Sequence, residues 1–254
     1  MSSRAPRKRG WEKPYAPDQM IALVLHPLLT VYFYVLSGLS MPRHLLASTL
    51  VPYAILGVLV LYLWLWVELV DPSTEGGIIL PCKGKAQEGS QYCPSCRKAV
   101  RGFDHHCTWL NTCIGTKNYL QFYLLTLVGL LHYTLQTVVG VLALTIWIDD
   151  DQLADAFGSV MAGRALWGSQ SALAFWIALS FGSLCGFHSF LFVVGMGTYE
   201  WVMDGQRKRA AKRAAKAAEA RTTRRRETTP PQSAPNASFG LGTAMDVDSP
   251  AEMA

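Results

Sequence analysis

Leu45 to Val67 reads LLASTLVPYAILGVLVLYLWLWV, without a single Asp, Glu, Lys or Arg. An α-helix needs about 20 mostly apolar residues to cross about 30 Å of hydrocarbon, so this stretch is long enough to span a membrane. Three more charge-free stretches run from Ile21 to Met41, from Tyr119 to Ile148 and from Ser171 to Gly197. Hydrophobic residues make up 50% of the chain and charged residues only 16%. We therefore predict an all-α integral membrane protein with four transmembrane helices.

Lysine and arginine are unevenly distributed around these stretches. They are abundant before the first, between the second and third, and after the fourth, whereas the other two connections offer only Arg43 and Arg164. Positive residues near the ends of membrane helices stay on the cytoplasmic side. Both termini and the central loop are therefore expected in the cytoplasm, and the third connection in the lumen or exterior.

The predicted organisation has six parts. They are a basic cytoplasmic N-terminus at 1–18, helices 1 and 2 at 19–70, a cytoplasmic cysteine-rich domain at 71–118, helices 3 and 4 at 119–200 with a lumenal loop at about 149–168, a basic juxtamembrane helix or tail at 201–227, and a disordered tail at 228–254. The basic segment either binds anionic lipid or only fixes the topology. The last segment is rich in Pro, Ser, Thr, Ala and Gly, a composition typical of disorder.

Cysteine and histidine residues cluster in the central loop. They are Cys82, Cys93, Cys96, His105, His106, Cys107 and Cys113. The cytoplasm is reducing and five thiols cannot all pair, so disulfides explain the cluster poorly. The loop is rich in Gly and Pro and poor in apolar residues. Bound metal would supply the folding free energy that a core does not.

The spacing predicts one structural Zn²⁺ site. Cys93 and Cys96 form a C-x2-C pair, which can occupy two adjacent corners of a zinc tetrahedron. If residues 104–107 are extended, neighbouring side chains point to opposite faces. His106 can then join Cys93, Cys96 and Cys113 as the fourth ligand. Such a closed site does no chemistry, but it fixes the backbone beside it.

The opposite face of the same segment carries a candidate nucleophile. Cys107 is expected to act as a thiolate, with His105 as its base and Asp104 as the group that orients the imidazole. The spacing alone leaves open that Cys107 and His105 are further zinc ligands. Trp109 suits a site at the membrane interface, and equally suits a simple interfacial anchor.

These residues resemble the cysteine-rich domain of the DHHC-type protein S-acyltransferases, the zinc finger DHHC palmitoyltransferases. The similar residues are Asp104, His105, His106, Cys107, Trp109, Asn111, Cys113, Gly115, Asn118 and Phe122. An Asp71-Pro72 pair after the second stretch and a Gly197-Thr198-Tyr199-Glu200 element after the fourth are also similar. The resemblance extends over most of the chain and leaves out the tails.

The resemblance implies a two-step transfer. Cys107 would attack palmitoyl-CoA, or another acyl-CoA, and pass the acyl group to a cysteine of a substrate protein. His105 would manage the proton and Asp104 would orient His105. Thr198 would contact Asp104, although an ordinary helix-end hydroxyl is the alternative for this residue.

The resemblance also suggests where acyl-CoA binds. The acyl chain would lie among the four helices, with His132 at the floor of the cavity, where family members carry a residue that limits chain length. An inter-helix hydrogen bond is the alternative role for His132. Trp109 is also expected to bind acyl-CoA, and Lys98, Arg101 and Lys117 are plausible partners for the phosphates of coenzyme A.

This sequence departs from the family pattern of two zinc sites. Tyr92, Ala99 and Lys85 stand where ligands of the other site are usual, so one Zn²⁺ is expected. Cys82 is a remnant of that site, a second acylation site or an inert thiol. Thr108 replaces a customary proline and loosens a fixed dihedral beside the nucleophile.

The expected partners are acyl-CoA, membrane lipids and cysteine-containing substrate proteins at the cytoplasmic face, with no nucleic acid. We expect a multi-pass protein of an endomembrane, either the Golgi or the endoplasmic reticulum. The alternative function is a catalytically weak membrane scaffold that binds partner proteins. A channel or transporter is disfavoured because the predicted spans contain no charges.

Overall fold

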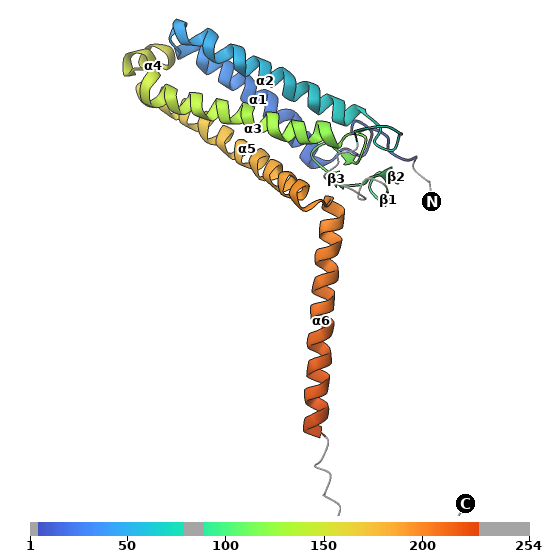
Figure 1. Cartoon of the computed structure of the whole chain (residues 1–254). Helices are drawn as coiled ribbons and strands as arrows, with labels where there is room; N and C mark the ends of the chain where they lie inside the picture. The colour runs from blue at the N-terminus through green and yellow to red at the C-terminus, as the bar shows by residue number, and fades with distance from the viewer. Residues whose placement is uncertain (1–4, 79–88, 229–254) are drawn as a thin grey trace, which may run out of the picture. The chain divides into compact units, whose positions relative to one another are not determined.

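The computed structural model describes residues 5–78 and 89–228. Its helices are α1 (Pro17–Ser40), α2 (Arg43–Leu69), α3 (Tyr119–Leu142), the π-helical turn η2 (Ala143–Trp147), α4 (Asp150–Phe157), α5 (Val160–Val194) and α6 (Thr198–Thr228); its strands are β1 (Ser90–Cys93), β2 (Lys98–Arg101), β3 (His105–Cys107) and β4 (Thr112–Ile114). In this part of the chain, α1, α2, α3 with η2, and α5 are long and apolar enough to cross a membrane. The prediction of four transmembrane helices is confirmed. Figure 1 shows them side by side, with the strands at one end and α4 at the other.

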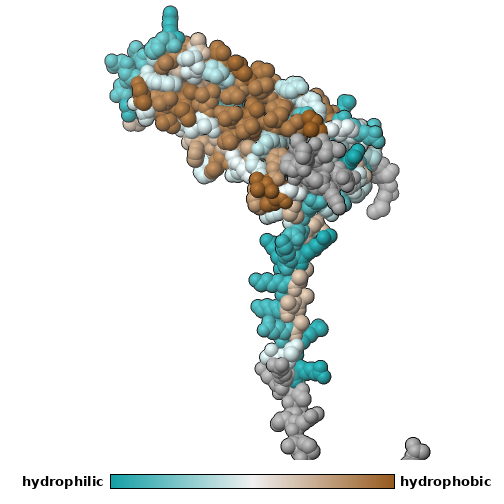
Figure 2. All heavy atoms as spheres, viewed as in Figure 1, coloured by the Kyte–Doolittle hydropathy of each residue, from teal (hydrophilic) through white to brown (hydrophobic). Residues whose placement is uncertain are grey.

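The outer surface of the four helices is apolar. Val58 is 66% exposed and Val193 is 86% exposed, and only 22–39% of each apolar stretch is buried inside the protein. Figure 2 shows the hydrophobic residues as a broad band along the helices and hydrophilic residues at the α4 end. A water-soluble helical protein would turn this surface inward, so we conclude that it faces lipid.

Some polar side chains between the helices form hydrogen bonds from one helix to another. The amide of Gln136 donates to the carbonyl of Leu29 at 3.2 Å, and the indole of Trp167 donates to Ser40 Oγ at 3.0 Å. Lipid offers no hydrogen bonds, so such groups hold neighbouring helices in register.

The connection between α3 and α5 is more helical than expected. Asp149 caps α4 by accepting from the backbone of Gln152, whose side chain accepts from the backbone of Asp149. Gly158, at φ 72°, ends α4, and α5 begins at Val160, well before the expected span from Ser171. The capping box and the left-handed glycine define a helix that hydropathy alone does not reveal.

The cysteine-rich segment forms two antiparallel hairpins, which the all-α prediction did not include. β1 pairs with β2, and β3 pairs with β4. Both turns use left-handed residues, Arg97 at φ 53° and Asn111 at φ 49°. Cysteine and histidine spacing, not apolar alternation, marks these short strands, so periodicity did not find them.

Residues 206–228 belong to a second unit, described here by itself, which contains most of α6. Its side chains are exposed through Arg225 and are mainly alanine, arginine and lysine. α6 covers residues 201–227, which were predicted as a basic juxtamembrane helix or tail. Cys82 and Lys85 lie outside the described residues, and so does the disordered tail predicted at 228–254, apart from Thr228 at the end of α6.

Candidate functional site

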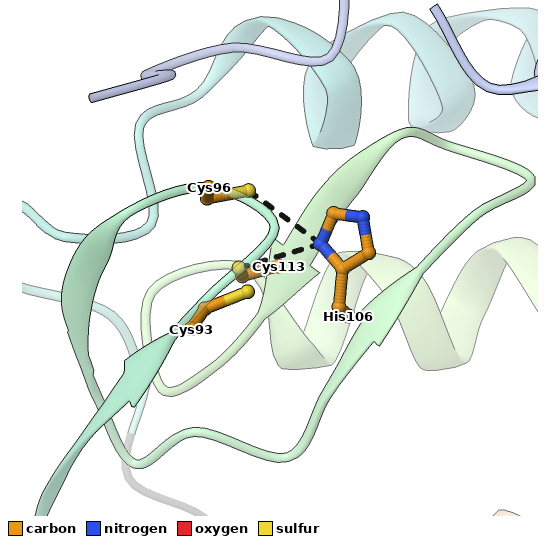
Figure 3. Close-up of side chains that lie close together, drawn as sticks. All are labelled: Cys93, Cys96, His106 and Cys113. Atoms are coloured by element: carbon orange, nitrogen blue, oxygen red, sulfur yellow. Dashed lines mark hydrogen bonds between the residues drawn. The ribbon is translucent and has the colours of Figure 1, made fainter. Parts of the chain in front are cut away.

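Three cysteines and one histidine converge where the two hairpins meet. Cys93 ends β1 and Cys96 lies in the turn that follows, while His106 of β3 pairs with Cys113 of β4. Their four donor atoms all lie within 4.8 Å of one another, and the three cysteines are buried. Figure 3 shows the three sulfur atoms and the imidazole pointing toward a common centre.

The spacing of these donors fits a tetrahedral zinc ion. The Nδ1 atom of His106 lies 3.5 Å from Cys96 Sγ and 3.6 Å from Cys113 Sγ. Zinc bonds of about 2.3 Å to sulfur and about 2.0 Å to nitrogen, at tetrahedral angles, would separate the two donors by about 3.5 Å. Three sulfurs and one nitrogen complete the coordination, so this would be a structural site without an open position.

The local electrostatics also favour a cation. Burial lowers the pKa of His106, but hydrogen bonds with the Cys93 and Cys96 thiols raise it to a net value of about 9. Sulfur atoms that stabilise a proton on the ring would equally stabilise a metal ion in the same place.

Asp104 and His105 form a second group on the other face of β3. The carboxylate of Asp104 accepts a hydrogen bond from His105 Nδ1 at 2.9 Å. It also accepts two hydrogen bonds from Thr198 at the start of α6, one from the backbone N–H at 3.0 Å and one from Oγ1 at 2.5 Å. Asp104 is only 3% exposed. These hydrogen bonds fix the position of the Asp104 carboxylate, which in turn orients the His105 imidazole.

Cys107 lies next to this imidazole and outside the four-residue metal cluster. Burial lowers the pKa of His105, but hydrogen bonds with Asp104 and Cys107 raise it to a net value of about 9. Since Nδ1 faces Asp104, Nε2 is the ring atom left for the thiol. The adjacent imidazoles of β3 therefore face different groups: His106 faces the cysteine cluster, and His105 faces the Asp104 carboxylate and the Cys107 thiol.

The Cys107 thiol faces the membrane-spanning helices. It packs in one apolar cluster with Val60, Trp64 and Val67 of α2 and Phe122 of α3. A nucleophile in this position can meet a group that enters from the lipid side.

Two residues of this site were not anticipated from the sequence. His188 of α5 brings its imidazole within 4.8 Å of the Asp104 and His105 donor atoms, and its Nδ1 hydrogen-bonds the hydroxyl of Tyr119 at 2.8 Å. Both side chains are buried. The available signal was a histidine near the end of an otherwise apolar span, which is costly to bury without a partner.

The three basic residues predicted to contact coenzyme A differ in their exposure and in their hydrogen-bond partners. Lys98 ion-pairs with Asp71 at 2.7 Å and its side chain is 8% exposed, Lys117 donates to the carbonyl of Glu75, and Arg101 is exposed. Partial burial raises the pKa of Asp71, but hydrogen bonds from Lys98 and Ser73 lower it below its ordinary value. Lys98 thus joins the end of α2 to β2.

Trp109 and His132 lie in contrasting surroundings. Trp109 is 52% exposed at the turn that follows Cys107. His132 is buried inside the bundle and stacks on Tyr53 with ring centroids 4.3 Å apart. Gly57 of α2 lies against this imidazole, and a Cβ there would make an ordinary van der Waals contact with it at 3.4 Å.

Residues 89–228 and 5–78 contain no second cysteine cluster. Tyr92 and Ala99 pair across β1 and β2, and Tyr92 is 61% exposed. The remaining free cysteine in these ranges, Cys185, is buried in α5. Among the described residues, Cys93, Cys96, His106 and Cys113 form the one group with cysteine donors; Asp104, His105 and His188 form a second group of donor atoms that could hold a metal ion.

Comparison with known proteins gives a consistent result. A family model described as DHHC palmitoyltransferase matches residues 73–205. The chain is 30% identical over 130 residues to probable protein S-acyltransferase 20 of Arabidopsis thaliana, covering 48% of this chain and 18% of the relative. It is 57% identical over 35 residues to palmitoyltransferase SWF1 of Saccharomyces cerevisiae, covering 14% of this chain and 10% of the relative. It is 28% identical over 119 residues to human palmitoyltransferase ZDHHC9, covering 47% and 32%. The matched part is thus less than a third of each relative's length.

Proposed function

Because this chain belongs to the DHHC palmitoyltransferase family, we propose that it is a protein-cysteine S-palmitoyltransferase that carries the acyl group on Cys107. The observation that supports this most is the position of Cys107, hydrogen-bonded to His105 and separate from the metal cluster. A thiol beside an oriented imidazole is an activated nucleophile.

The proposed reaction has two balanced steps. In the first, His105 Nε2 takes the thiol proton and Cys107 Sγ attacks the thioester carbonyl of acyl-CoA. The bond to the coenzyme A sulfur breaks, and that sulfur leaves with the proton. In the second, a substrate cysteine gives its proton to His105 and attacks the acyl-Cys107 thioester, which returns Cys107 to a thiol. Asp104 stabilises the imidazolium that forms in both steps.

The metal cluster would act by positioning. Zinc bound there would tie β1, β3 and β4 together and supply folding free energy. Cys93, Cys96, His106 and Cys113 would hold it, and the chemistry would stay with the residues on the other face of β3.

The acyl chain would extend from Cys107 into the bundle, toward His132. The apolar residues around Cys107 support this direction. We propose that His132 sets the preferred chain length, and His132→Ala would then accept longer acyl-CoA than the wild type. The exposed His44, replaced by Ala, is the control. An unchanged chain-length profile in His132→Ala would refute this part.

The coenzyme A moiety would stay outside the bundle. Arg101 is exposed and suits a phosphate contact, whereas Lys98 and Lys117 already bind protein groups. By the positive-inside rule, we propose that this end of the bundle and both termini are cytoplasmic, in an endomembrane. The basic α6 would then run along or near anionic lipid.

A scaffold with weak catalysis is the second candidate. Thr108 beside the nucleophile, and Tyr92 and Ala99 where the family usually has zinc ligands, favour it. A scaffold has no physical need for a thiol beside an oriented imidazole, so we prefer the enzyme.

Labelling of the purified protein separates the two candidates. Incubation with radiolabelled palmitoyl-CoA should give a thioester that mild hydroxylamine releases. The label should disappear in Cys107→Ala and persist in Cys185→Ala, which removes a buried thiol elsewhere. No labelled intermediate, under conditions that label a known relative, would favour the scaffold.

A further inference from the structure

The segment before α1, residues 5–16, is part of the site and not a free tail. We call it the N-terminal arm. Its Arg7 is only 6% exposed, although arginine near a chain terminus is usually solvated. The backbone N–H of Arg7 donates to the carbonyl of Cys96 at 2.9 Å, and its Nη1 donates to the carbonyl of Pro14 at 2.9 Å.

The guanidinium of Arg7 reaches the metal cluster. Its Nη2 donates to Cys96 Sγ at 3.4 Å and lies 3.3 Å from His106 Nε2. If Nδ1 of His106 bound the metal, its Nε2 would carry the ring proton and could not accept a hydrogen bond from Arg7. Cys96 Sγ would then be the acceptor, and the His106 ring would only be in contact with the guanidinium. Three thiolates, a neutral imidazole and Zn²⁺ carry one net negative charge, which is costly to bury alone. Arg7 brings one positive charge to that place.

Gly10 joins the arm to three other elements. Its N–H donates to the carbonyl of Glu68 at the end of α2, at 2.8 Å. Its carbonyl accepts from Gln19 of α1 at 3.1 Å and from Asn111 at 2.9 Å. A Cβ at this position would lie 2.4 Å from the carbonyl oxygen of Leu110, so only glycine allows the approach.

Asn111 is where the arm meets the loop that follows Cys107. Its Nδ2 donates to the carbonyl of Gly10 and to that of Pro14 at 3.1 Å, and Asn111 is 2% exposed. Three residues before Asn111, the hydroxyl of Thr108 donates to the carboxylate of Asp18, at the start of α1, at 2.5 Å. The loop after the nucleophile is thus held by the arm and by the first turn of α1.

We propose that the N-terminal arm is a positioning element of acyl transfer: Arg7 balances the charge of the zinc cluster, and the arm backbone holds the Cys107 loop through Asn111. This deepens the proposed function and rests on it. Beside the cysteine cluster of the described residues, the arm supplies a further, metal-free attachment for the same loop.

The charge role is tested by zinc release from the purified full-length chain in detergent. We compare Arg7→Gln, which keeps a donor and loses the charge, with Arg7→Lys, which keeps the charge. Loss of a group that supports metal ligands typically costs 10–100-fold in metal affinity, so Arg7→Gln should release zinc to a chelating indicator about tenfold faster. Arg7→Lys and the exposed Arg9→Gln should resemble the wild type. Equal release from Arg7→Gln and Arg9→Gln would overturn the charge role.

The holding role is tested with Asn111→Asp, which keeps the shape and removes both donated bonds. Trypsin should cut the arm after Lys8 or Arg9 about tenfold faster in this variant, and kcat of acyl-enzyme formation should fall about tenfold with KM for palmitoyl-CoA unchanged. Gln91→Glu, the same chemical change at an exposed residue, is the control. An arm cut at the wild-type rate, or a change in KM alone, would contradict the proposal. If the wild type forms no acyl-enzyme, the proposed function fails, while zinc release and proteolysis still report on the arm.

Discussion

Replacing Asp104 by Asn tests the catalytic geometry most directly, because it removes a charge and keeps the shape. One carboxylate oxygen accepts from the Thr198 backbone, and the other accepts from Thr198 Oγ1 and His105 Nδ1. Asparagine has only one such oxygen. If that oxygen keeps the hydrogen bond from the Thr198 backbone N–H, the NH₂ group of the asparagine faces the His105 imidazole.

His105 would respond by moving its proton. To accept from the amide, Nδ1 must lose its hydrogen, which places the proton on Nε2. That atom then cannot take the proton of Cys107. The Asp104 carboxylate also helps to raise the pKa of His105, so Asp104→Asn makes the imidazole a weaker base as well. The corresponding change in a Ser-His-Asp triad lowers kcat about 10⁴-fold, and we expect a fall of about 10³-fold or more here.

The assay is a single-turnover reaction with excess palmitoyl-CoA, quenched in acid and read by intact-protein mass spectrometry. Asp150→Asn, which breaks an exposed ion pair with Arg164 beyond the opposite end of the bundle, is the control. Zinc content is measured on the same samples. A fall of less than tenfold in Asp104→Asn with zinc retained would refute the tautomer argument. Loss of zinc in this variant would mean that Asp104 supports the hairpins instead.

The other predictions address the supports of the site. Thr198→Val removes one hydrogen bond to a charged group, about 2 kcal/mol, so single-turnover acylation should slow about 30-fold; a rate within threefold of wild type would contradict this. His188→Ala should slow acylation about tenfold at unchanged zinc content, measured in the same assay, since its ring packs beside His105; zinc loss would point to a different role. Asp71→Asn should destabilise the protein by about 2 kcal/mol, seen as a lower thermal midpoint. Because the pKa of Asp71 is lowered, its contribution to stability is present above the ordinary carboxyl pKa of about 3.9 and is lost only as pH falls through the lower pKa of the folded state. The loss of stability in Asp71→Asn should therefore be equal at pH values of about 5 and 8. A loss of stability that is smaller at about pH 5 would argue against the ion pair with Lys98. Chelation of zinc should abolish acylation and expose the hairpins to protease, while far-UV circular dichroism should keep its helical signal. If the chelated protein still forms the acyl-enzyme, the metal is not needed to position Cys107.

The sequence was sufficient for the parts of the fold that depend on composition. Uninterrupted apolar runs mark α1, α2 and α3 within a few residues, since a bilayer imposes length directly. The start of α5 was missed because its first turns, with Gly163 and Arg164, are neither apolar enough for a span nor polar enough for a loop. α4 depends on a capping box, a local signal that hydropathy averages away.

In the site, too, residues close together in the sequence could be placed from the sequence, whereas residues contributed by distant segments could not. Alternation along residues 104–107 predicted that His105 and His106 point to opposite faces, and in the structure His106 faces the cysteine cluster while His105 faces Asp104. His188 and Arg7 reach the site from α5 and from the arm, far away in the sequence. A lone histidine in an apolar helix or an arginine near a terminus has many possible surroundings, and only packing decides among them.

The hairpins have little apolar core, yet the proposed reaction needs Cys107 held within a fraction of an ångström. Three attachments meet this need from different directions. The metal cluster would fix the faces of β3 and β4 through His106 and Cys113. Thr198 fixes Asp104 from α6, and the arm fixes Asn111 after the nucleophile. Each attachment uses polar bonds to a separate element, so loss of one should loosen the loop without unfolding the bundle. Zinc release and proteolysis of the arm therefore each report on one attachment, whereas acylation should fall when any of the three is lost.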